Sequence, residues 1–212
     1  MLIAVENVSI EFDGVRVLSS FSATFQSGKV TALVGPSGSG KTSLLGVMAG
    51  LAKPTHGRVT LHEAGLPPCE PDPVNVVWVP QGSNALATRS ALENVMVAAL
   101  ADGASFERAT AQADRALNAV GLRNRRTALA RQLSGGELQR LSIARALASS
   151  RPLLFADEPT ANLDEGNSIK IASILRDLPS TSRTIVVSTH DPLLMSAADH
   201  VVQLRGRGSD AD

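Results

Sequence analysis

The sequence predicts an α/β fold with a mainly parallel β-sheet as its core, antiparallel strands at the N-terminus and an inserted helical subdomain. Strand-like and helical segments alternate on both sides of the middle of the chain, which is the pattern of a doubly wound parallel sheet. Two long strand-like segments come before this alternation. The stretch from Ser90 to about Ser149 is helical with no convincing strand, so we expect it to be inserted into the sheet-forming part.

The first third of the chain contains strand-like segments around a glycine-rich turn. Asp13-Gly14 separates the first two segments, and a predicted helix over 42–51 follows the glycine-rich turn. A loop with four prolines separates the last two segments. We expect strands over 2–8, 15–25, 30–34, 57–61 and 74–79.

The middle and the end of the chain carry recognisable helix starts. Ser90 and Glu93 have the spacing of a capping box, which favours a helix beginning there. Asp191-Pro192 favours a short helix, because an acidic cap followed by proline suits the first helical turn. Beyond the helical stretch we expect strands over 152–156, 184–188 and 201–204, and a helix over 165–178.

These elements predict a single domain over 1–212. Its core would comprise 1–82 and 151–205, its helical subdomain would comprise 83–150, and 206–212 would be a frayed tail. A chain of 212 residues with 43% hydrophobic residues is long enough to bury a sizeable core.

Composition excludes some classes of function. A formal net charge of +0 disfavours a nucleic-acid binder that relies on a broad basic surface. Cys69 is the single cysteine, so no intrachain disulfide is possible, and it reads as an ordinary loop residue. The N-terminus lacks a signal-peptide pattern, and apolar runs such as 95–101 are far shorter than the roughly 20 residues of a membrane span. We therefore expect any work at a membrane to depend on docking to a partner.

A phosphate-loop motif lies between a predicted strand and a predicted helix. Glycines let successive backbone N–H groups point at phosphate oxygens, and the helix N-terminus adds a partial positive charge. Lys41 would reach the β- and γ-phosphates, and the Thr42 hydroxyl would bind Mg²⁺. The motif predicts nucleotide binding without separating kinases, GTPases and transport ATPases. Its residues, called the phosphate loop below, are Gly35, Pro36, Ser37, Gly38, Ser39, Gly40, Lys41 and Thr42.

Two carboxylates end a buried strand. The run 153–156 is apolar and precedes Asp157 and Glu158, which would stand at the carboxyl end of a parallel strand, where ligands collect. Neighbouring side chains of a strand point to opposite faces, so the two acids would have different tasks. We expect Asp157 to serve Mg²⁺, through water, and Glu158 to polarise the attacking water as a general base.

A second glycine-rich segment, Leu133–Glu137, precedes a strong helical pattern. Such a helix start binds anions, and Ser134 adds a hydroxyl donor. Since the phosphate loop already holds one triphosphate, a second phosphate-binding segment predicts a nucleotide sandwiched between two copies. Without other motifs, this segment would read as an ordinary helix cap. It is called the signature segment below.

Together these motifs resemble those of the ATP-binding-cassette (ABC) ATPases, in the same order and over essentially the whole chain. That resemblance implies a P-loop NTPase fold. The nearest branch is the one for lipoprotein release, macrolide efflux and cell division, although that branch commonly has glycine where Ala161 stands. The matching positions are Phe12, Gly35–Thr42 (Walker A), Gln81 after 78–80, Leu133–Glu137 (family signature), Leu153–Glu158 (Walker B), 161–164 (D-loop) and His190.

The resemblance also implies roles for individual residues. Phe12 would stack on adenine, although the family usually has tyrosine there, and a neighbouring hydrophobe such as Val17 would complete the pocket. Gln81 would sense Mg²⁺ and the γ-phosphate, and His190 would bond to the γ-phosphate. By the same resemblance, ATP would contact the phosphate loop and Ser43, Mg²⁺ would contact Thr42, Gln81 and Asp157, and the opposing subunit's nucleotide would contact Ser134, Gly135, Gly136, Glu137 and Asp164.

The resulting functional expectation is the ATP-hydrolysing subunit of a membrane transporter. It would pair with a second copy or a homologous ATPase subunit, and with a separate transmembrane permease. It would lie peripherally at the cytoplasmic face of the cell membrane and bind no nucleic acid. One alternative is an ABC-type ATPase that signals to a membrane or cell-wall partner without moving a solute. Another is a soluble ATPase acting on nucleic acid or the ribosome, which the neutral charge and the lack of tandem cassettes or a coiled-coil insert disfavour.

Four arginines before the signature segment form a local basic cluster. A contact with a partner or with lipid headgroups would use such a cluster, but a solvated face of the helical subdomain is the more common origin. The cluster comprises Arg123, Arg125, Arg126 and Arg131.

Overall fold

Five strands pair in parallel to form the central sheet of the computed structural model, which describes residues 1–161, 163–177 and 183–205. Three of these strands, β3, β6 and β7, are buried at every residue, because a parallel sheet is covered on both faces. The expected α/β class with a mainly parallel core is confirmed. In spatial order the strands are β5 (Val76–Val79), β6 (Leu153–Asp157), β7 (Thr184–Ser188), β3 (Val30–Val34) and β8 (His200–Gln203).

A second, antiparallel sheet is formed by β2 (Val15–Phe25), β1 (Leu2–Phe12) and β4 (His56–His62), in that order. Asp13 and Gly14 form the turn of the first hairpin, and both have positive φ. β1 runs four residues beyond the expected strand over 2–8. Its pairing register shifts on both sides of Val8, and Asn7 has a φ of 50°, so the alternating pattern breaks while the strand continues.

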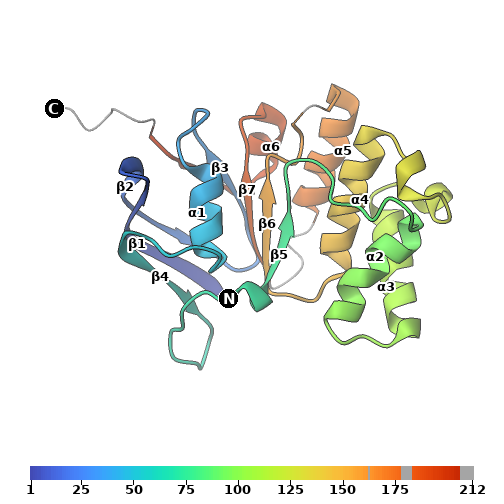
Figure 1. Cartoon of the computed structure of the whole chain (residues 1–212), viewed down its shortest axis with the longest axis horizontal. Helices are drawn as coiled ribbons and strands as arrows, with labels where there is room; N and C mark the ends of the chain where they lie inside the picture. The colour runs from blue at the N-terminus through green and yellow to red at the C-terminus, as the bar shows by residue number, and fades with distance from the viewer. Residues whose placement is uncertain (162, 178–182, 206–212) are drawn as a thin grey trace.

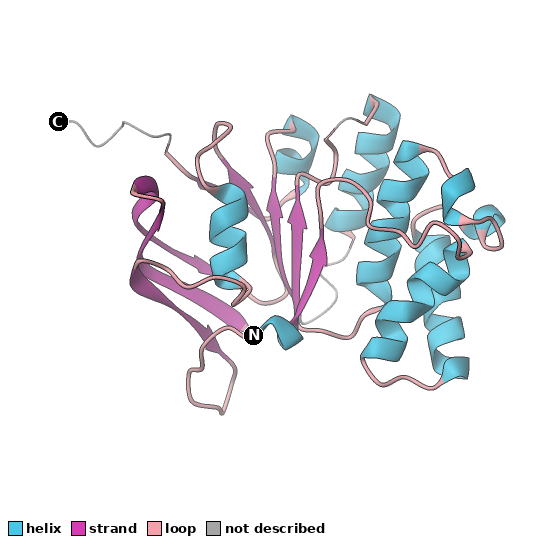
Figure 2. Ribbon diagram, in the orientation of Figure 1, coloured by secondary structure: helices cyan, strands magenta, loops and turns pink. Residues whose placement is uncertain are grey.

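The helices fall into two groups. In Figure 1, α1 lies between the two sheets, whereas α2, α3 and α4 gather beyond β5, on the side away from the antiparallel sheet. Figure 2 shows the same division between strands and helices. No helix among the described residues is both long and apolar enough to cross a membrane. The helices are α1 (Lys41–Met48), η1 (Pro73–Asn75), α2 (Ala91–Ala101), α3 (Phe106–Ala119), η2 (Arg123–Arg125), η3 (Ala130–Gln132), α4 (Gly135–Ala148), α5 (Glu165–Arg176) and α6 (Pro192–Ala197).

The central sheet separates two apolar layers. Leu153 and Phe155 of β6 belong to a core with β1 and α1, whereas Leu154 and Ala156 belong to a core with α2 to α5. This alternation follows from the period of two along a strand. The sheet therefore joins the helical group to the rest of the chain through continuous packing.

Several predicted boundaries differ from the observed ones. Val74 and Asn75 belong to η1 rather than to a strand, because the Asp72 side chain caps a short helix that has Pro73 in its first turn. The helix expected over 42–51 ends at Met48, and Gly50 follows with a φ of 74°. The last strand begins one residue earlier than predicted, at His200.

The domain limits at 82/83 and 150/151 stay a prediction, although α2 to α4 fall between them. The expected tail over 206–212 and the last residue of the helix expected over 165–178 lie outside the described residues. Cys69 is exposed and forms an isolated antiparallel bridge with Leu61.

Candidate functional site

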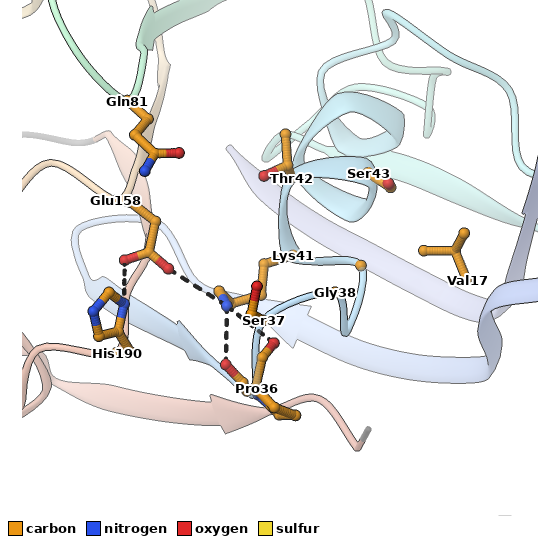
Figure 3. Close-up of a pocket in the computed structure, with 12 residues that line it drawn as sticks. Val17, Pro36, Ser37, Gly38, Lys41, Thr42, Ser43, Gln81, Glu158 and His190 are labelled. Carbon is orange, nitrogen blue, oxygen red and sulfur yellow. Dashed lines mark hydrogen bonds and ion pairs between the residues drawn. The ribbon is translucent and has the colours of Figure 1, made fainter. Parts of the chain in front are cut away.

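One pocket of about 640 Å³ lies where several parallel strands end. The phosphate loop follows β3, Glu158 follows β6, His190 follows β7 and Gln81 follows β5. Figure 3 shows Gln81, Glu158 and His190 on one side of the pocket and α1 on the other. The lining residues are Val17, Gly35, Pro36, Ser37, Gly38, Gly40, Lys41, Thr42, Ser43, Gln81, Glu158 and His190.

The phosphate loop leaves the N-terminus of α1 open for an anion. Gly40 caps the helix with a φ of 89°, makes no side-chain cap bond, and no acidic residue follows in the first turn. A Cβ at Gly35 would stand 2.9 Å from the Leu204 carbonyl oxygen, so only glycine fits there. Ser39 is the exception among the predicted loop residues, because it is buried and does not line the pocket.

Lys41 holds its charge inside the pocket. Its side chain is 10% exposed, and Nζ donates to the carbonyl oxygens of Gly35 (2.9 Å) and Pro36 (3.4 Å). Nζ also lies 3.4 Å from Glu158 Oε1 (Figure 3). The ammonium group is therefore paired, and an incoming anion competes with these oxygens for it.

Glu158 lies between two potentially cationic groups in an unusual backbone conformation. Its Oε2 is 2.9 Å from Nδ1 of the exposed His190, while Oε1 faces Lys41. Its φ is 45°, in the left-handed region that costs a non-glycine residue of order 1–3 kcal/mol. The Glu158 N–H donates to both the carbonyl oxygen and the hydroxyl of Ser188, each at 3.0 Å, and these bonds fix the conformation.

Asp157 is buried and accepts two hydroxyl hydrogen bonds. Thr42 Oγ1 donates to Oδ2 at 2.8 Å, and Ser188 Oγ donates to Oδ1 at 2.5 Å. The carboxylate and the Thr42 hydroxyl are hard oxygen donors of the kind that Mg²⁺ accepts alongside waters and substrate phosphates. The described residues contain no cluster of three or more histidines, cysteines or acids that could hold a metal unaided. This donor set fits a cation shared with a phosphate ligand.

Phe12 does not reach this pocket in the described structure. It ends β1 at the hairpin, its side chain is 51% exposed, and it is not among the lining residues. Val17 does line the pocket, and a Cβ at Gly40 would meet Val17 Cγ1 at 3.0 Å. The apolar wall beside the phosphate loop is therefore supplied by β2.

The signature segment forms the N-terminus of α4, outside the pocket of its own chain. The Ser134 side chain accepts from the Glu137 N–H, and the Glu137 carboxylate accepts from the Ser134 N–H at 2.8 Å. This backbone bond, together with Arg125, lowers the pKa of Glu137. Asp164 caps α5 and also lies outside the pocket.

Two residues of the site were missed by sequence reasoning. Ser188 bonds to both members of the acidic pair, because β6 and β7 are neighbours and Asp157 is in register with Ser188. Asn167 contacts Asp164 and α4. Neither residue has a sequence signal of its own, since strand order and helix packing decide both contacts.

Comparison with known proteins gives a consistent result. Residues 18–161 match the family model described as ABC transporter. The chain is 36% identical over 200 residues to the ABC transporter ATP-binding protein Rv0986 of Mycobacterium tuberculosis, covering 90% of this chain and 80% of that protein. It is 35% identical over 197 residues to the macrolide export ATP-binding/permease protein MacB of Hyphomonas neptunium, covering 90% of this chain and 30% of that protein. This chain therefore spans less than a third of the MacB relative.

Solved structures agree with the sequence matches. The dimeric ABC transporter cassette MJ0796 superposes with a TM-score of 0.82 at 29% identity, covering 96% of this chain and 94% of that one. The same cassette in a dimeric post-hydrolysis state with ADP and Pi also gives a TM-score of 0.82 at 29% identity, covering 97% and 96%.

Proposed function

The chain belongs to the ABC transporter family, and from that membership we propose that it is an ATPase subunit whose ATP-driven dimer closure powers a membrane transporter. The observation that carries this proposal is the meeting of Lys41, Glu158 and His190 beside the open N-terminus of α1. The pocket then holds both a positive charge that can bind phosphate and a carboxylate that can accept a proton from water. These are the parts that phosphoryl transfer to water requires.

Nucleotide binding would rearrange the charges of the pocket. A triphosphate seated on the phosphate loop draws the Lys41 ammonium away from the carbonyl oxygens of Gly35 and Pro36. It also replaces Glu158 as the partner of Lys41 and His190. The freed Glu158 carboxylate then accepts a hydrogen bond from the attacking water and acts as the general base.

Thr42, Asp157 and Gln81 are the residues that we propose for Mg²⁺. Thr42 and Asp157 already share a hydrogen bond, and Gln81 lines the same pocket. Mg²⁺ bound there would neutralise charge on the β- and γ-phosphate oxygens. The Ser188 bond to Asp157 would keep one carboxylate oxygen fixed while the other turns toward the metal.

The signature segment and Asp164 would act on a second copy. Both lie outside the pocket of their own chain, and the signature segment places Gly135 and Gly136 in the first turn of α4, where backbone N–H groups of a helix N-terminus can meet a phosphate. The MJ0796 cassette named above is dimeric. A closed dimer of this chain, or a pair with a homologous subunit, would hold each ATP between two chains. Its movement would pass to a separate transmembrane permease at the cytoplasmic face of the membrane.

The central test is Glu158→Gln. Without a general base, turnover should fall by roughly 10²-fold or more, while ATP binding and ATP-dependent dimerisation persist. Steady-state phosphate release and sedimentation of the ATP-loaded protein measure the two properties. Near-normal hydrolysis in this variant would contradict the assignment of the base.

Transport is tested separately. The chain should co-purify with a multi-span membrane protein, and the complex in sealed vesicles should move solute only with ATP. A complex that hydrolyses ATP without moving any solute would favour the signalling alternative.

A further inference from the structure

The N-terminal half of α4 and the first turn of α5 are joined by one amide side chain, that of Asn167. Its Oδ1 accepts a hydrogen bond from Arg140 of α4. Its Nδ2 donates to Asp164 Oδ2 at 2.7 Å, and its backbone N–H donates to Asp164 Oδ1 at 2.8 Å. In Figure 1, α4 and α5 lie side by side. One residue therefore contacts both the helix that carries the signature segment and the residue that caps α5.

The chemistry of this bridge is specific to an amide. Arg140 is a cation and needs an acceptor, whereas Asp164 is an anion and needs a donor. An asparagine presents both groups from one rigid plane, whereas an aspartate could only accept and would repel Asp164. The hydrogen bonds from Asn167 also lower the pKa of Asp164, which keeps that carboxylate charged.

On the α4 side of the bridge, Arg140 has no second side chain among the described residues that could replace Asn167 as its acceptor. Arg140 is 9% exposed, and Asn167 is its only side-chain hydrogen-bond partner among the described residues. Its Nε is buried and unpaired there. Leaving such a cation without its acceptor is costly, because a buried charge needs a partner.

The Asn167 side chain also limits the space at Gly136 of the signature segment. A Cβ added there would stand 2.7 Å from Asn167 Nδ2 and 2.9 Å from Asn167 Cγ. Gly136 is not among the positive-φ glycines, so space rather than backbone freedom explains the glycine. The second glycine of the motif therefore admits the Asn167 side chain.

We propose that Asn167 is a positioning residue that holds the signature segment and Asp164 in a fixed relation, so that both reach the partner's nucleotide together. This inference rests on the proposed dimer closure. Asn167 does not line the pocket, so its action on ATP passes through the two segments that it joins.

The test uses Asn167→Asp in the hydrolysis-deficient Glu158→Gln protein. The substitution keeps the shape and the acceptor for Arg140 but loses the donor to Asp164. Sedimentation equilibrium with ATP should give a dimer dissociation constant raised about tenfold or more, equivalent to about 1.4 kcal/mol. Fluorescent ATP should bind the monomer with unchanged affinity. Asn118→Asp, at an exposed position on α3, is the matched control and should leave both constants unchanged.

A double-mutant cycle with Arg140→Met separates positioning from general destabilisation. The two substitutions should be non-additive in their effect on dimerisation, because each breaks one half of the same bridge and the second break then has less left to disrupt. A dimer constant for Asn167→Asp within twofold of its parent, or fully additive effects, would overturn the inference.

Hydrogen exchange of the nucleotide-free monomer keeps the inference testable even if dimer closure fails. If the Glu158→Gln parent stays monomeric with ATP, the proposed function is wrong at that step. A monomer carrying Asn167→Ala, which loses the side-chain contacts to both helices, should still exchange the amides of 135–138 and 165–168 several-fold faster than the parent. Faster exchange at α5 alone, with α4 unchanged, would overturn the coupling.

Discussion

At the scale of single residues, the acidic pair depends on a serine from the neighbouring strand. Ser188 bonds to Asp157 through its hydroxyl and to the Glu158 N–H through both its oxygens. The left-handed φ of Glu158 persists because these bonds oppose its cost. The position of the proposed general base is thus set by β7 as much as by β6.

Ser188→Ala should weaken this arrangement. Loss of the hydroxyl leaves one Asp157 oxygen unpaired, and hydrogen bonds to charged groups contribute about 1.5–3 kcal/mol. We expect the free energy of unfolding to fall by about that amount, with a lower kcat as Glu158 gains freedom. Urea denaturation and steady-state hydrolysis check the two effects. A variant with normal stability and normal kcat would contradict the role given to Ser188.

Lys41→Ala removes the cation that we propose to bind the phosphates. Lys41 is the positively charged side chain most enclosed by the pocket, so calorimetry should show a large loss of affinity for ATP. Lys29, which pairs with Asp199 at the protein surface, offers a control substitution with little expected effect. Unchanged ATP affinity in Lys41→Ala would count against the phosphate loop as the binding site.

At the scale of elements, sequence patterns predicted the starts of helices well because caps are local. The Ser90–Glu93 capping box and the Asp191 cap with proline behind it are both present. Buried strands were predicted equally well from their apolar runs, as at 30–34 and 184–188. The bulge in β1 escaped prediction, because it depends on how β1 pairs with β2 and β4, which the residues of β1 alone do not encode.

For the site, too, local motifs could be found in the sequence and contacts between elements could not. The phosphate loop and the acidic pair are contiguous motifs, and the structure brings the phosphate loop and Glu158 to one pocket, while Asp157 bonds to Thr42 beside it. Phe12 was expected beside them from its place in the motif order, and it lies outside the lining. Asn167 and Ser188 act through contacts between elements, which a motif does not encode.

The junction between α2, α4 and β6 makes a pH-dependent contribution to stability. Asp102 accepts hydrogen bonds from Ser149 Oγ (2.7 Å), the Ser150 N–H (2.7 Å) and Arg151 Nε (2.9 Å). Burial raises the pKa of Asp102, but these bonds outweigh it and the pKa is lowered overall. A lowered native pKa means that the stabilisation is complete above the ordinary aspartate pKa of about 3.9 and is lost as pH falls through the native value.

Asp102→Asn tests this contribution. At pH 7 the variant should lose about 1–3 kcal/mol of unfolding free energy, because the bond to charged Arg151 is weakened. The difference from the unmodified protein should shrink as the pH falls below about 4, where the carboxylate of the unfolded chain becomes protonated, and it should vanish once the pH is below the lowered native pKa of Asp102. Urea titrations at several pH values measure this difference in the free energy of unfolding. A difference that stays constant down to the lowest pH would contradict the assignment.

At the scale of the whole molecule, α4 connects three regions that the proposed cycle must coordinate. Gln139 reaches the Pro80 carbonyl oxygen beside Gln81, and Arg145 bonds to Asn84. Arg140 reaches Asn167 near Asp164. The signature segment thus begins a helix that contacts both the Gln81 segment and α5.

A composite site between two chains predicts complementation. Lys41→Ala damages one half of each site and Ser134→Leu damages the other half, so each variant alone should hydrolyse little ATP. In an equal mixture, half of the dimers would pair the two variants and carry one intact site, restoring about a quarter of the normal rate. Separate assays of each variant serve as controls. No recovery in the mixture would contradict a nucleotide shared between chains.

The single exposed cysteine gives this protein a built-in attachment point. Cys69 sits in the loop after β4, apart from the pocket, so a fluorophore or spin label there leaves the phosphate loop untouched. In a symmetric pair the two labels would be related by the twofold axis, and the separation between them would report opening and closing directly. The motion itself could then be followed in real time without engineering a new thiol.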